Sequence, residues 1–296
     1  MPPRAVVVGG LGFLGAAVVR ELAARGADVV VVDRKASGAA CERLFGKGAV
    51  MWRRTDISDR TALRSCCRGA DELYHFAGRL GTSELETDLH GAIQENIAGA
   101  VNVFEAAMRA GVGRVFYPSK PNVWLNAYTI TKIAAEQFAE MFSRQGLPIS
   151  SLRYFNAYGP GQKVGPVRKI IPTFALQALR NQPLTVYGDG EQTVDMIYSS
   201  DLARVTIDVM RRPHHAEPLD LGRGIALTVN QVAADVIAQL GSRSAIQHLP
   251  MRDGETPGTQ LVANITPLRR LLGDLAFADW SHSLSHTLEW YARTAA

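Results

Sequence analysis

The chain has 296 residues, of which 47% are hydrophobic and 20% are charged, and its formal net charge is +4. Such a chain can bury a full core and can divide into two lobes around a cleft. The basic residues are dispersed and form no run, which argues against a nucleic-acid partner. No apolar stretch approaches the roughly 20 residues that a membrane-spanning helix needs, so we expect no membrane association.

The cysteines are odd in number, and two of the three (Cys41, Cys66 and Cys67) are adjacent. They do not make a disulfide framework, so we expect a reducing compartment, the cytoplasm. A strand-like apolar run begins close to the first residue and leaves no room for a signal peptide. The histidines form no ligand-like cluster and no C-x-x-C occurs, so we expect no metal.

Short apolar runs beside glycines predict buried strands at 5–8, 29–32, 50–52, 72–76, 114–117 and 149–155. Apolar residues at helical spacing predict helices over 13–25, 92–110 and 127–144. Strands that alternate with helices indicate an α/β fold with a Rossmann-like, doubly wound parallel sheet. Ligands bind such a sheet at the carboxyl ends of its strands.

The regular alternation stops after Gly161. A helix over 170–180 and a strand over 184–187 follow, and the segment 195–211 is expected to return to the main sheet. We therefore predict a Rossmann domain made of residues 1–157 and 194–222. A smaller C-terminal substrate-binding lobe is predicted from residues 158–193 and 223–296.

A glycine-rich turn follows the first predicted strand. Gly10, Gly12 and Gly15 fit G-x-G-x-x-G, and Gly9, Gly12 and Gly15 fit G-x-x-G-x-x-G. Glycines allow a tight turn and bring the backbone close to a pyrophosphate, which the N-terminus of the next helix attracts. A glycine-rich turn can also serve packing alone, but its place between a strand and a helix favours a dinucleotide site.

An acidic residue ends the second predicted strand. Asp33 follows Gly15 by 18 residues, close to the ~20 that the dinucleotide motif requires. Its carboxylate can accept hydrogen bonds from both adenosine ribose hydroxyls and would repel a 2′-phosphate, which favours NAD over NADP. Arg34 and Lys35 follow directly and weaken that preference.

Tyr128 and Lys132 stand four residues apart, which places them on one face of a helix. A tyrosine, with a pKa of ~10, must lose about 3 pKa units, or ~4 kcal/mol, to act as a base near pH 7. One positive charge at ~4 Å in an effective dielectric of ~20 supplies about that much. The spacing is common by chance and could mark a solvent-facing pair, but the glycine turn favours a catalytic pair.

These residues resemble the extended short-chain dehydrogenase/reductase family, the NAD-dependent epimerase/dehydratases that act on nucleotide sugars. The resemblance runs from about residue 5 to about residue 273. Its motifs, in order, are the glycine turn 9–15, Asp33, Asp56-Ile57, His75-Phe76-Ala77-Gly78, Asn96, Tyr128 with Lys132, the segment 153–161, the segment 186–193 and Arg252-Asp253-Gly254-Glu255.

The resemblance implies roles for individual residues. Asp56 and Ile57 should bracket the adenine, and Lys132 should also bond the nicotinamide ribose. The residues expected at the cofactor are Gly9, Gly12, Phe13, Leu14, Gly15, Asp33, Arg34, Asp56, Ile57, Phe76, Ala77, Gly78, Asn96, Tyr128, Lys132 and Tyr154. Those expected at the substrate are Thr82, Lys120, Asn156 and Arg252, and those expected in catalysis are Tyr128, Lys132 and Ser119.

The chain departs from the family pattern before the tyrosine. Family members usually carry a serine or threonine just after the fifth strand, and here Lys120 takes that place with Ser119 one residue earlier. The segment up to Tyr128 is also shorter than usual. Ser119 could swing in to hold the substrate oxygen, Lys120 could do so as a cation, or the tyrosine could work alone.

A second departure concerns the substrate's diphosphate. Val194 stands where the family commonly has an arginine for that group. Arg168 or Lys169 could replace it, or the substrate could present a different anion.

The leading hypothesis is a nucleotide-sugar 4-epimerase, in which Tyr128 takes the proton of the 4-hydroxyl while NAD takes and later returns the C4 hydride. A dehydratase or decarboxylase would begin with the same oxidation, but a dehydratase usually has an Asp-Glu pair that residues 118–124 lack. A ketoreductase would have to admit NADPH past Asp33. A non-catalytic NAD sensor or scaffold would tend to lose Tyr128 or Lys132. The family's equivalent helices imply a homodimer through 92–110 and 127–144.

Overall fold

Valine-rich segments form the centre of the protein's main sheet. In a computed structural model, which describes residues 2–121, 123–214, 217–252 and 254–295, β1 (Arg4–Val8) lies between β2 (Asp28–Asp33) and β4 (Glu72–His75). Valine suits this place because β-branched side chains pack well on a pleated sheet that is covered on both faces. Asp253, in the matched segment 252–255, and Asn122, in the segment that departs from the family pattern, lie outside the described residues.

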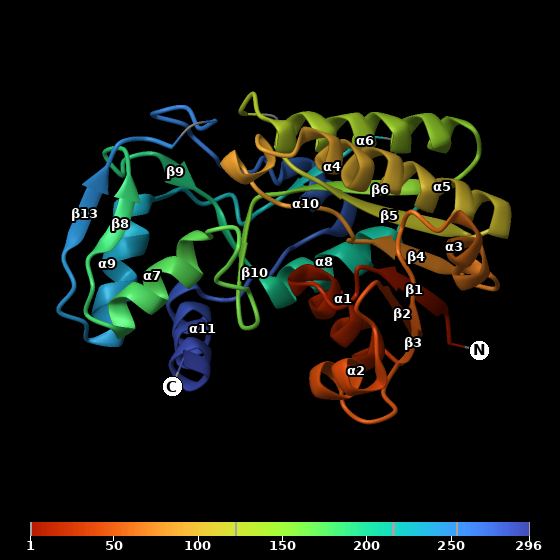
Figure 1. The fold of residues 1–296 in the computed structure, drawn as a ribbon, viewed down its shortest axis with the longest axis horizontal. Coiled ribbons are helices and arrows are strands. Elements are labelled where there is room, and N and C mark those ends of the chain that lie inside the picture. The colour runs from red at the N-terminus through yellow and green to blue at the C-terminus, as the bar shows by residue number, and fades with distance from the viewer. Residues whose placement is uncertain (1, 122, 215–216, 253, 296) are drawn as a thin grey trace.

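The sheet has seven strands in the order β11-β6-β5-β4-β1-β2-β3 (Figure 1). The remaining strands are β3 (Met51–Arg54), β5 (Arg114–Ser119), β6 (Ile149–Tyr154) and β11 (Leu219–Leu221). Every pairing in this sheet is parallel. The predicted doubly wound α/β fold is confirmed.

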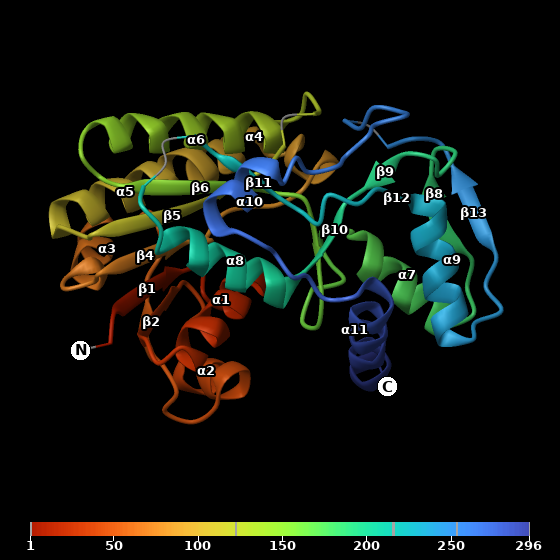
Figure 2. The ribbon, with the colours of Figure 1, turned by 180° about the vertical axis from the view of Figure 1, so that it is seen from behind.

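Helices cover both faces of the sheet (Figures 1 and 2). On one face lie α1 (Phe13–Ala24), α2 (Gly38–Phe45), α8 (Ser199–Met210) and α10 (Thr266–Leu272). On the other lie α3 (Arg60–Cys67), α5 (Gly99–Ala110) and α6 (Ala127–Arg144). Each face has its own apolar core, and the three free cysteines are buried in these cores.

The predicted helix over 92–110 is longer and less regular than expected. It begins with α4 (Leu89–Ile93), passes through a π-helical turn (Gln94–Ala98) and continues as α5. A 3₁₀ turn (Ser83–Leu85) precedes it. Because π-helical turns shift a side chain out of the regular helical register and often occur at functional sites, the turn around Asn96 bears on the site described below.

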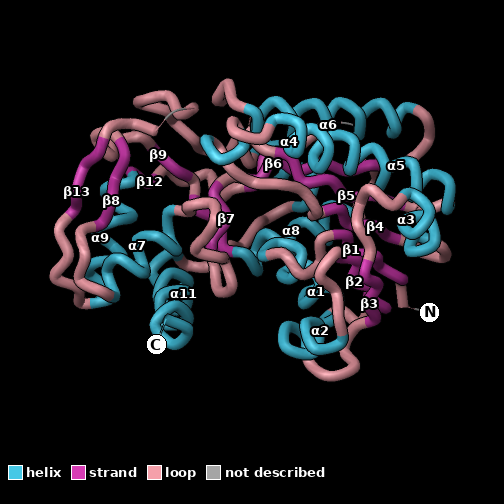
Figure 3. The backbone as a smooth tube through the Cα atoms, viewed as in Figure 1, coloured by secondary structure: helices cyan, strands magenta, loops and turns pink. Residues whose placement is uncertain are grey.

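The C-terminal lobe stands beside the main sheet (Figure 3) and has a separate core. In it, α7 (Ile170–Leu179), α9 (Val229–Leu240) and α11 (Trp280–Ala295) pack beside β8 (Leu184–Tyr187), which pairs with β13 (Ile246–Leu249). Two short pairs connect the lobe to the main sheet: β7 (Asn156–Tyr158) with β10 (Met196–Tyr198), and β9 (Thr193–Val194) with β12 (Leu227–Thr228).

Strand β11 forms one edge of the main sheet, and α8 packs on one of its faces. Helix α10, which the predicted boundary assigns to the lobe, packs against α8 and β11 instead. Within the described ranges, the longest apolar helices fall short of a membrane span. No group of acidic, histidine or cysteine side chains in those ranges could hold a metal ion.

Candidate functional site

The glycine turn brings three backbone segments into contact at the end of β1. Gly9 has a φ of +82°, and a Cβ there would lie 2.4 Å from the backbone nitrogen of Ala77. A Cβ at Gly15 would lie 2.3 Å from the carbonyl oxygen of Gly9. Only glycine fits at these two positions, because any side chain would collide with backbone rather than with a movable group.

Helix α1 starts at this turn with its N-terminus open. Gly12 is the N-cap residue, and among the described residues no side chain caps the helix and no acid lies in its first turn. The free N–H groups of a helix start carry partial positive charge and bind phosphate. The turn therefore fits the pyrophosphate of a dinucleotide.

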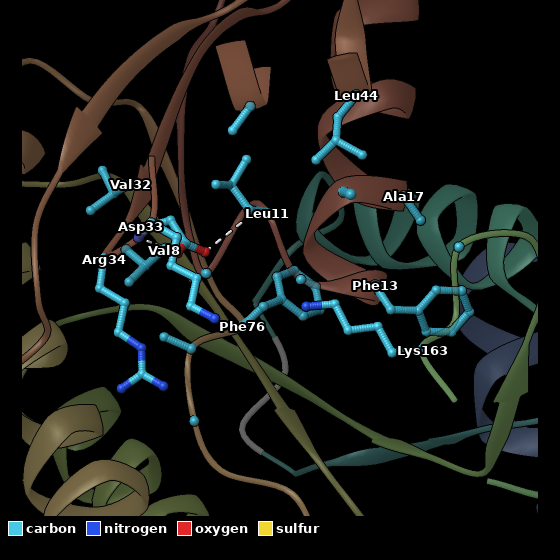
Figure 4. A pocket seen from close by; sticks show the side chains of 18 of the residues that line it. Val8, Leu11, Phe13, Ala17, Val32, Asp33, Arg34, Leu44, Phe76 and Lys163 are labelled. Atoms are coloured by element: carbon cyan, nitrogen blue, oxygen red, sulfur yellow. Dashed lines mark hydrogen bonds between the residues drawn. The ribbon is translucent and has the colours of Figure 1, made fainter. Parts of the chain in front are cut away.

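A pocket of about 1220 Å³ opens in front of this turn (Figure 4). The predicted cofactor residues that line it are Gly9, Gly12, Phe13, Asp33, Arg34, Asp56, Ile57, Phe76, Ala77 and Gly78. They come from the ends of separate strands, as the parallel sheet requires. The pocket extends to residues of the C-terminal lobe, including Lys163 and Trp290.

Two carboxylates are fixed at one end of this pocket. Asp33 accepts hydrogen bonds from the backbone N–H groups of Leu11 (3.2 Å) and Lys35 (2.9 Å), and the first of these is drawn in Figure 4. Asp56 accepts from the backbone and hydroxyl of Ser58, and these bonds lower the pKa of Asp56. Both groups are held as acceptors, which suits the hydrogen-bond donors of an adenosine.

Some residues expected at the cofactor lie away from the pocket. The Tyr154 ring is buried and lies beside the rings of Phe76 and Phe116, and its hydroxyl bonds Thr206 Oγ1 at 2.5 Å. Leu14 packs against the core of the α1 face, and Gly15 packs on Gly9. The Tyr154 side chain thus lies in the core. Side chains alternate between the two faces along β6, and that of Tyr154 points to the face that α1 and α8 cover.

Asn96 joins the wall of the pocket to helix α6. Its Oδ1 accepts from the backbone N–H of Arg79 (2.7 Å), and its Nδ2 donates to the Arg79 carbonyl (3.1 Å) and to Thr131 Oγ1 (3.1 Å). A Cβ at Gly78 would lie 2.9 Å from that Oδ1. The π-helical turn thus places Asn96 as a clamp between the loop after β4 and the helix that carries Tyr128.

Helix α6 begins with a well-defined cap. Asn126 Oδ1 accepts from the Thr129 N–H (2.9 Å), and Glu86 Oε1 accepts from the Ala127 N–H (2.8 Å). Tyr128 and Lys132 follow in the first two turns, one turn apart, as predicted. Neither lines the large pocket; Asn96 and Thr131 connect them to its wall.

The electrostatics of this pair differ from the sequence expectation. The Lys132 amine lies 4.1 Å from the centroid of the Tyr117 ring, and burial lowers the pKa of Lys132 to about 7. The Glu136 carboxylate opposes that shift, and the Lys120 ammonium adds to it. Burial also raises the pKa of Tyr128 to about 12, where we expected the lysine to lower it. Loss of water disfavours both charges.

Ser119 and Lys120 have different surroundings. Ser119 is buried at the end of β5, and its Oγ has no hydrogen-bond partner in the part of the chain that the structure describes. Lys120 Nζ donates to Thr129 Oγ1 (2.7 Å) and to the Pro121 carbonyl (2.8 Å). It lies 5.9 Å from the ring centroids of both Trp124 and Tyr128.

The segment between β5 and α6 is fastened to the loop that carries Arg252. Trp124 Nε1 donates to Thr259 Oγ1 (3.1 Å), and Asn126 Nδ2 donates to the Gly254 carbonyl (3.1 Å). A Cβ at Gly254 would contact Thr82 at 3.4 Å, so the predicted Thr82 adjoins this junction. Asn156 lies on β7, where its backbone N–H bonds the Asp195 carbonyl at 2.9 Å.

Cations gather around Tyr187 at the edge of the lobe. The Arg252 guanidinium lies 5.0 Å from the Tyr187 ring centroid and pairs with Glu255, and Arg168 donates to the Tyr187 hydroxyl at 3.0 Å. Burial lowers the pKa of Lys169, which the charges of Glu84, Arg252 and Glu255 also influence. Val194 is buried in the core of the lobe.

Several residues at the site could not be identified from the sequence alone. Lys163, from the loop after β7, points into the pocket near Phe13 and Phe76 in Figure 4. Arg43, from α2, also lines it. Thr129 lies between Tyr128 and Lys132 in the sequence. Its contact with Lys120 depends on how the segment between β5 and α6 folds. Tyr187 was visible only as part of the matched segment 186–193.

The sequence profile of the NAD dependent epimerase/dehydratase family matches residues 5–222. The chain belongs to this family. NAD is accordingly its cofactor, and the open N-terminus of α1 with the oriented carboxylates of Asp33 and Asp56 fits the pyrophosphate and the adenosine of NAD. When bound, NAD supplies a hydride acceptor and donor.

Known members of the family are similar over the whole chain. UDP-N-acetyl-alpha-D-glucosaminuronate decarboxylase of Bacillus cytotoxicus is 28% identical over 318 residues, covering 98% of both chains. An epimerase structure from Methanothermobacter thermautotrophicus superposes with a TM-score of 0.92 at 25% identity, covering 99% of this chain and 93% of that one. MoeE5, solved with UDP-glucose and NAD, gives a TM-score of 0.87 at 27% identity, covering 99% and 100%.

Proposed function

We propose that this family member is a nucleotide-sugar 4-epimerase that oxidises C4 of the sugar transiently with its bound NAD. The observation that carries the proposal is the Tyr128–Lys132 pair at the start of α6, which Asn96 ties to the wall of the NAD pocket through Thr131. A partly buried phenol one helical turn from an amine, next to a nicotinamide cofactor, suits proton removal from a hydroxyl at the carbon that gives up a hydride.

In this proposal Tyr128 removes the proton of the 4-hydroxyl and returns it after the ketone has turned over in the site. Because burial raises the pKa of Tyr128 to about 12, the phenolate needs positive charge nearby before it can form near neutral pH. Lys132 offers one such charge when it is protonated. The positive charge of the oxidised cofactor offers another.

The cations around Tyr187 are proposed to hold the diphosphate of the substrate. Arg252, Lys169 and Arg168 lie there together, while Val194 contributes only apolar surface to the core of the lobe. Arginine binds phosphate oxygens through its planar fork, and a half-buried lysine adds a point charge. The relative MoeE5 was solved with UDP-glucose and with UDP-glucuronic acid, so uridine diphosphate sugars are the first substrates to test.

The direct test is to incubate the purified, NAD-loaded protein with UDP-glucose and with UDP-glucuronic acid and to identify the products by NMR and mass spectrometry. An epimerase yields a product of unchanged mass with inverted C4 and no net NADH. Steady accumulation of NADH with the sugar would contradict the proposal and indicate a dehydrogenase.

Nucleotide-uronate decarboxylation is the second candidate. It is favoured by the decarboxylase of Bacillus cytotoxicus, which matches this chain over 98% of both sequences. The first oxidation at C4 is the same in both reactions, so the same residues would serve. Loss of carbon dioxide from UDP-glucuronic acid, seen as a product of lower mass, would replace the epimerase proposal with this one.

A homodimer is proposed through the outer surface of α4 and α6. Ile130, Phe138 and Met141 are exposed at helical spacing on α6, and Leu89 and Ile93 are exposed on α4, which packs against α6. The three residues on α6 form a stripe on the side of that helix opposite to Tyr128 and Lys132. An exposed apolar stripe of this kind is typical of a helical interface.

A further inference from the structure

Lys120 is a cation without an acidic partner beside the catalytic tyrosine. Its amine donates to two neutral oxygens, Thr129 Oγ1 and the Pro121 carbonyl, and it forms no ion pair with any residue that the structure describes. An ammonium has three donors, so one N–H is left for another acceptor. The Lys120 side chain is half-buried, and a cation that is partly withdrawn from water is normally paired with an acid. Among the described residues no acid takes that place.

The position of the amine makes the missing partner an anion. Thr129 lies in the first turn of α6, whose N-terminus has partial positive charge, so a cation held there is disfavoured. Lys132, on the same helix, adds a second like charge. Burial in these surroundings lowers the pKa of Lys120 to about 8. Positive potential therefore converges near Tyr128, where it would stabilise a negative oxygen.

Ser119, the other candidate for this work, cannot reach a substrate in the observed arrangement. It is 3% exposed, and its Oγ is buried. The short segment after it turns the next side chain, Lys120, toward the rings of Trp124 and Tyr128. The bonds of Trp124 and Asn126 to the C-terminal lobe hold this segment in place.

We propose that Lys120 donates its remaining N–H to the sugar oxygen from which Tyr128 removes a proton, and that Thr129 positions Lys120 for this contact. The inference rests on the proposed C4 oxidation. No covalent bond forms to Lys120: the proton of the hydroxyl goes to Tyr128, the hydride goes from C4 to NAD, and the ammonium holds the oxygen while its negative charge develops. Lys120 is thus a catalytic residue and Thr129 a positioning residue.

The test compares NAD-loaded wild-type protein with Lys120→Met, using UDP-glucose and UDP-glucuronic acid as substrates. Loss of a preorganised donor at a developing oxyanion typically lowers kcat by about 10²- to 10³-fold. We expect a fall in kcat of that order for Lys120→Met, with KM changed far less and with NAD affinity unchanged. Lys120→Ser, which offers a hydroxyl, should recover part of the loss. Lys47→Met makes the same change at an exposed lysine and should behave as wild type.

Thr129 provides an independent pair of variants that leaves Lys120 in the chain. Thr129→Val removes the acceptor with little change in shape and should lower kcat by about tenfold, the effect of losing roughly 1.4 kcal/mol. Thr129→Ser keeps the acceptor and should restore kcat. A purely structural role for Thr129 would instead lower the stability of both variants without separating kcat from KM.

The outcomes separate this inference from the proposed function. A folded Lys120→Met that binds NAD and retains the wild-type kcat overturns the inference and leaves the C4 oxidation standing. If Lys120→Met does not fold, equal kcat values for Thr129→Val and Thr129→Ser overturn it. A wild-type protein that binds NAD but converts neither sugar overturns the proposed function and this inference with it.

Discussion

The Lys132 amine lies 4.1 Å from the centroid of the Tyr117 ring and makes no ion pair within the described residues. Glu136, the acid on the next turn of α6, pairs with Arg153 at 2.7 Å instead. The aromatic face attracts a cation, but it replaces water that attracts it more strongly. This explains why the pKa of Lys132 falls to about 7.

This relationship predicts a pH-dependent stability. An unfolded lysine has a pKa of ~10.4, whereas that of Lys132 in the folded chain is about 7. Between these values the unfolded chain binds more protons, so the free energy of unfolding rises with pH in this window. Lys132→Met removes the titrating amine and with it this part of the pH dependence.

The measurement is the melting temperature of the NAD-free protein as a function of pH. The melting temperature of Lys132→Met should exceed that of the wild type most at pH values near 6. This difference should shrink as the pH rises toward 10. Lys47→Met, at an exposed lysine, should differ from wild type by the same amount at every pH. A gain for Lys132→Met that stays constant with pH would show that Lys132 keeps its charge in the folded chain.

Much of the fold and of the cofactor pocket could be predicted from the sequence. Valine runs identify β1 and β2, and the glycine turn and Asp33 follow at the ends of those strands. Because parallel strands bring their carboxyl ends to one edge, Asp56 and Gly78, distant in sequence, could be placed in the same pocket. These features depend on local pattern and on sheet geometry alone.

The remaining features depend on tertiary packing. The pKa values of Tyr128 and Lys132 are set by burial, which the four-residue spacing does not reveal. Tyr154 could face either side of a strand that is covered on both faces, so its place in the core could not be predicted. Lys163 enters the pocket from a loop without regular structure.

Tyr128→Phe tests whether the phenol does chemistry. The substitution keeps the ring and removes the proton acceptor, so turnover of the nucleotide sugar should fall by about 10²- to 10⁴-fold, the usual contribution of a positioned acid or base. NAD affinity, measured by titration, should stay close to that of wild type because the large pocket does not include Tyr128. Unchanged turnover would favour a non-catalytic NAD sensor or scaffold.

Tyr154→Phe tests the placement of that side chain in the core. Loss of the hydroxyl removes the hydrogen bond to Thr206, and the free energy of unfolding should fall by about 1 kcal/mol. Thr206 keeps its bond to the Leu202 carbonyl, so no buried group is left without a partner by the change. Urea unfolding gives the stability. Weaker NAD binding without a loss of stability would show that the Tyr154 hydroxyl contributes to the cofactor site instead.

Ile130→Glu tests the proposed dimer. A carboxylate in the middle of the apolar stripe on α6 would have to be buried without a partner when two copies associate. Light scattering at micromolar concentration should therefore show a dimer for wild type and a monomer for the variant. Ile225→Glu changes a similarly exposed isoleucine (47% against 53%) in the C-terminal lobe and should remain dimeric. A monomeric wild type would contradict the proposed homodimer.

The central claim is a transient oxidation at C4, and the fate of the C4 hydrogen tests it most directly. UDP-glucose with deuterium at C4 should be converted to its C4 epimer with the deuterium still at C4, because the hydride leaves and returns within one site. Formation of the epimer with hydrogen from solvent at C4, or no change at C4 in a protein that binds NAD, would contradict it.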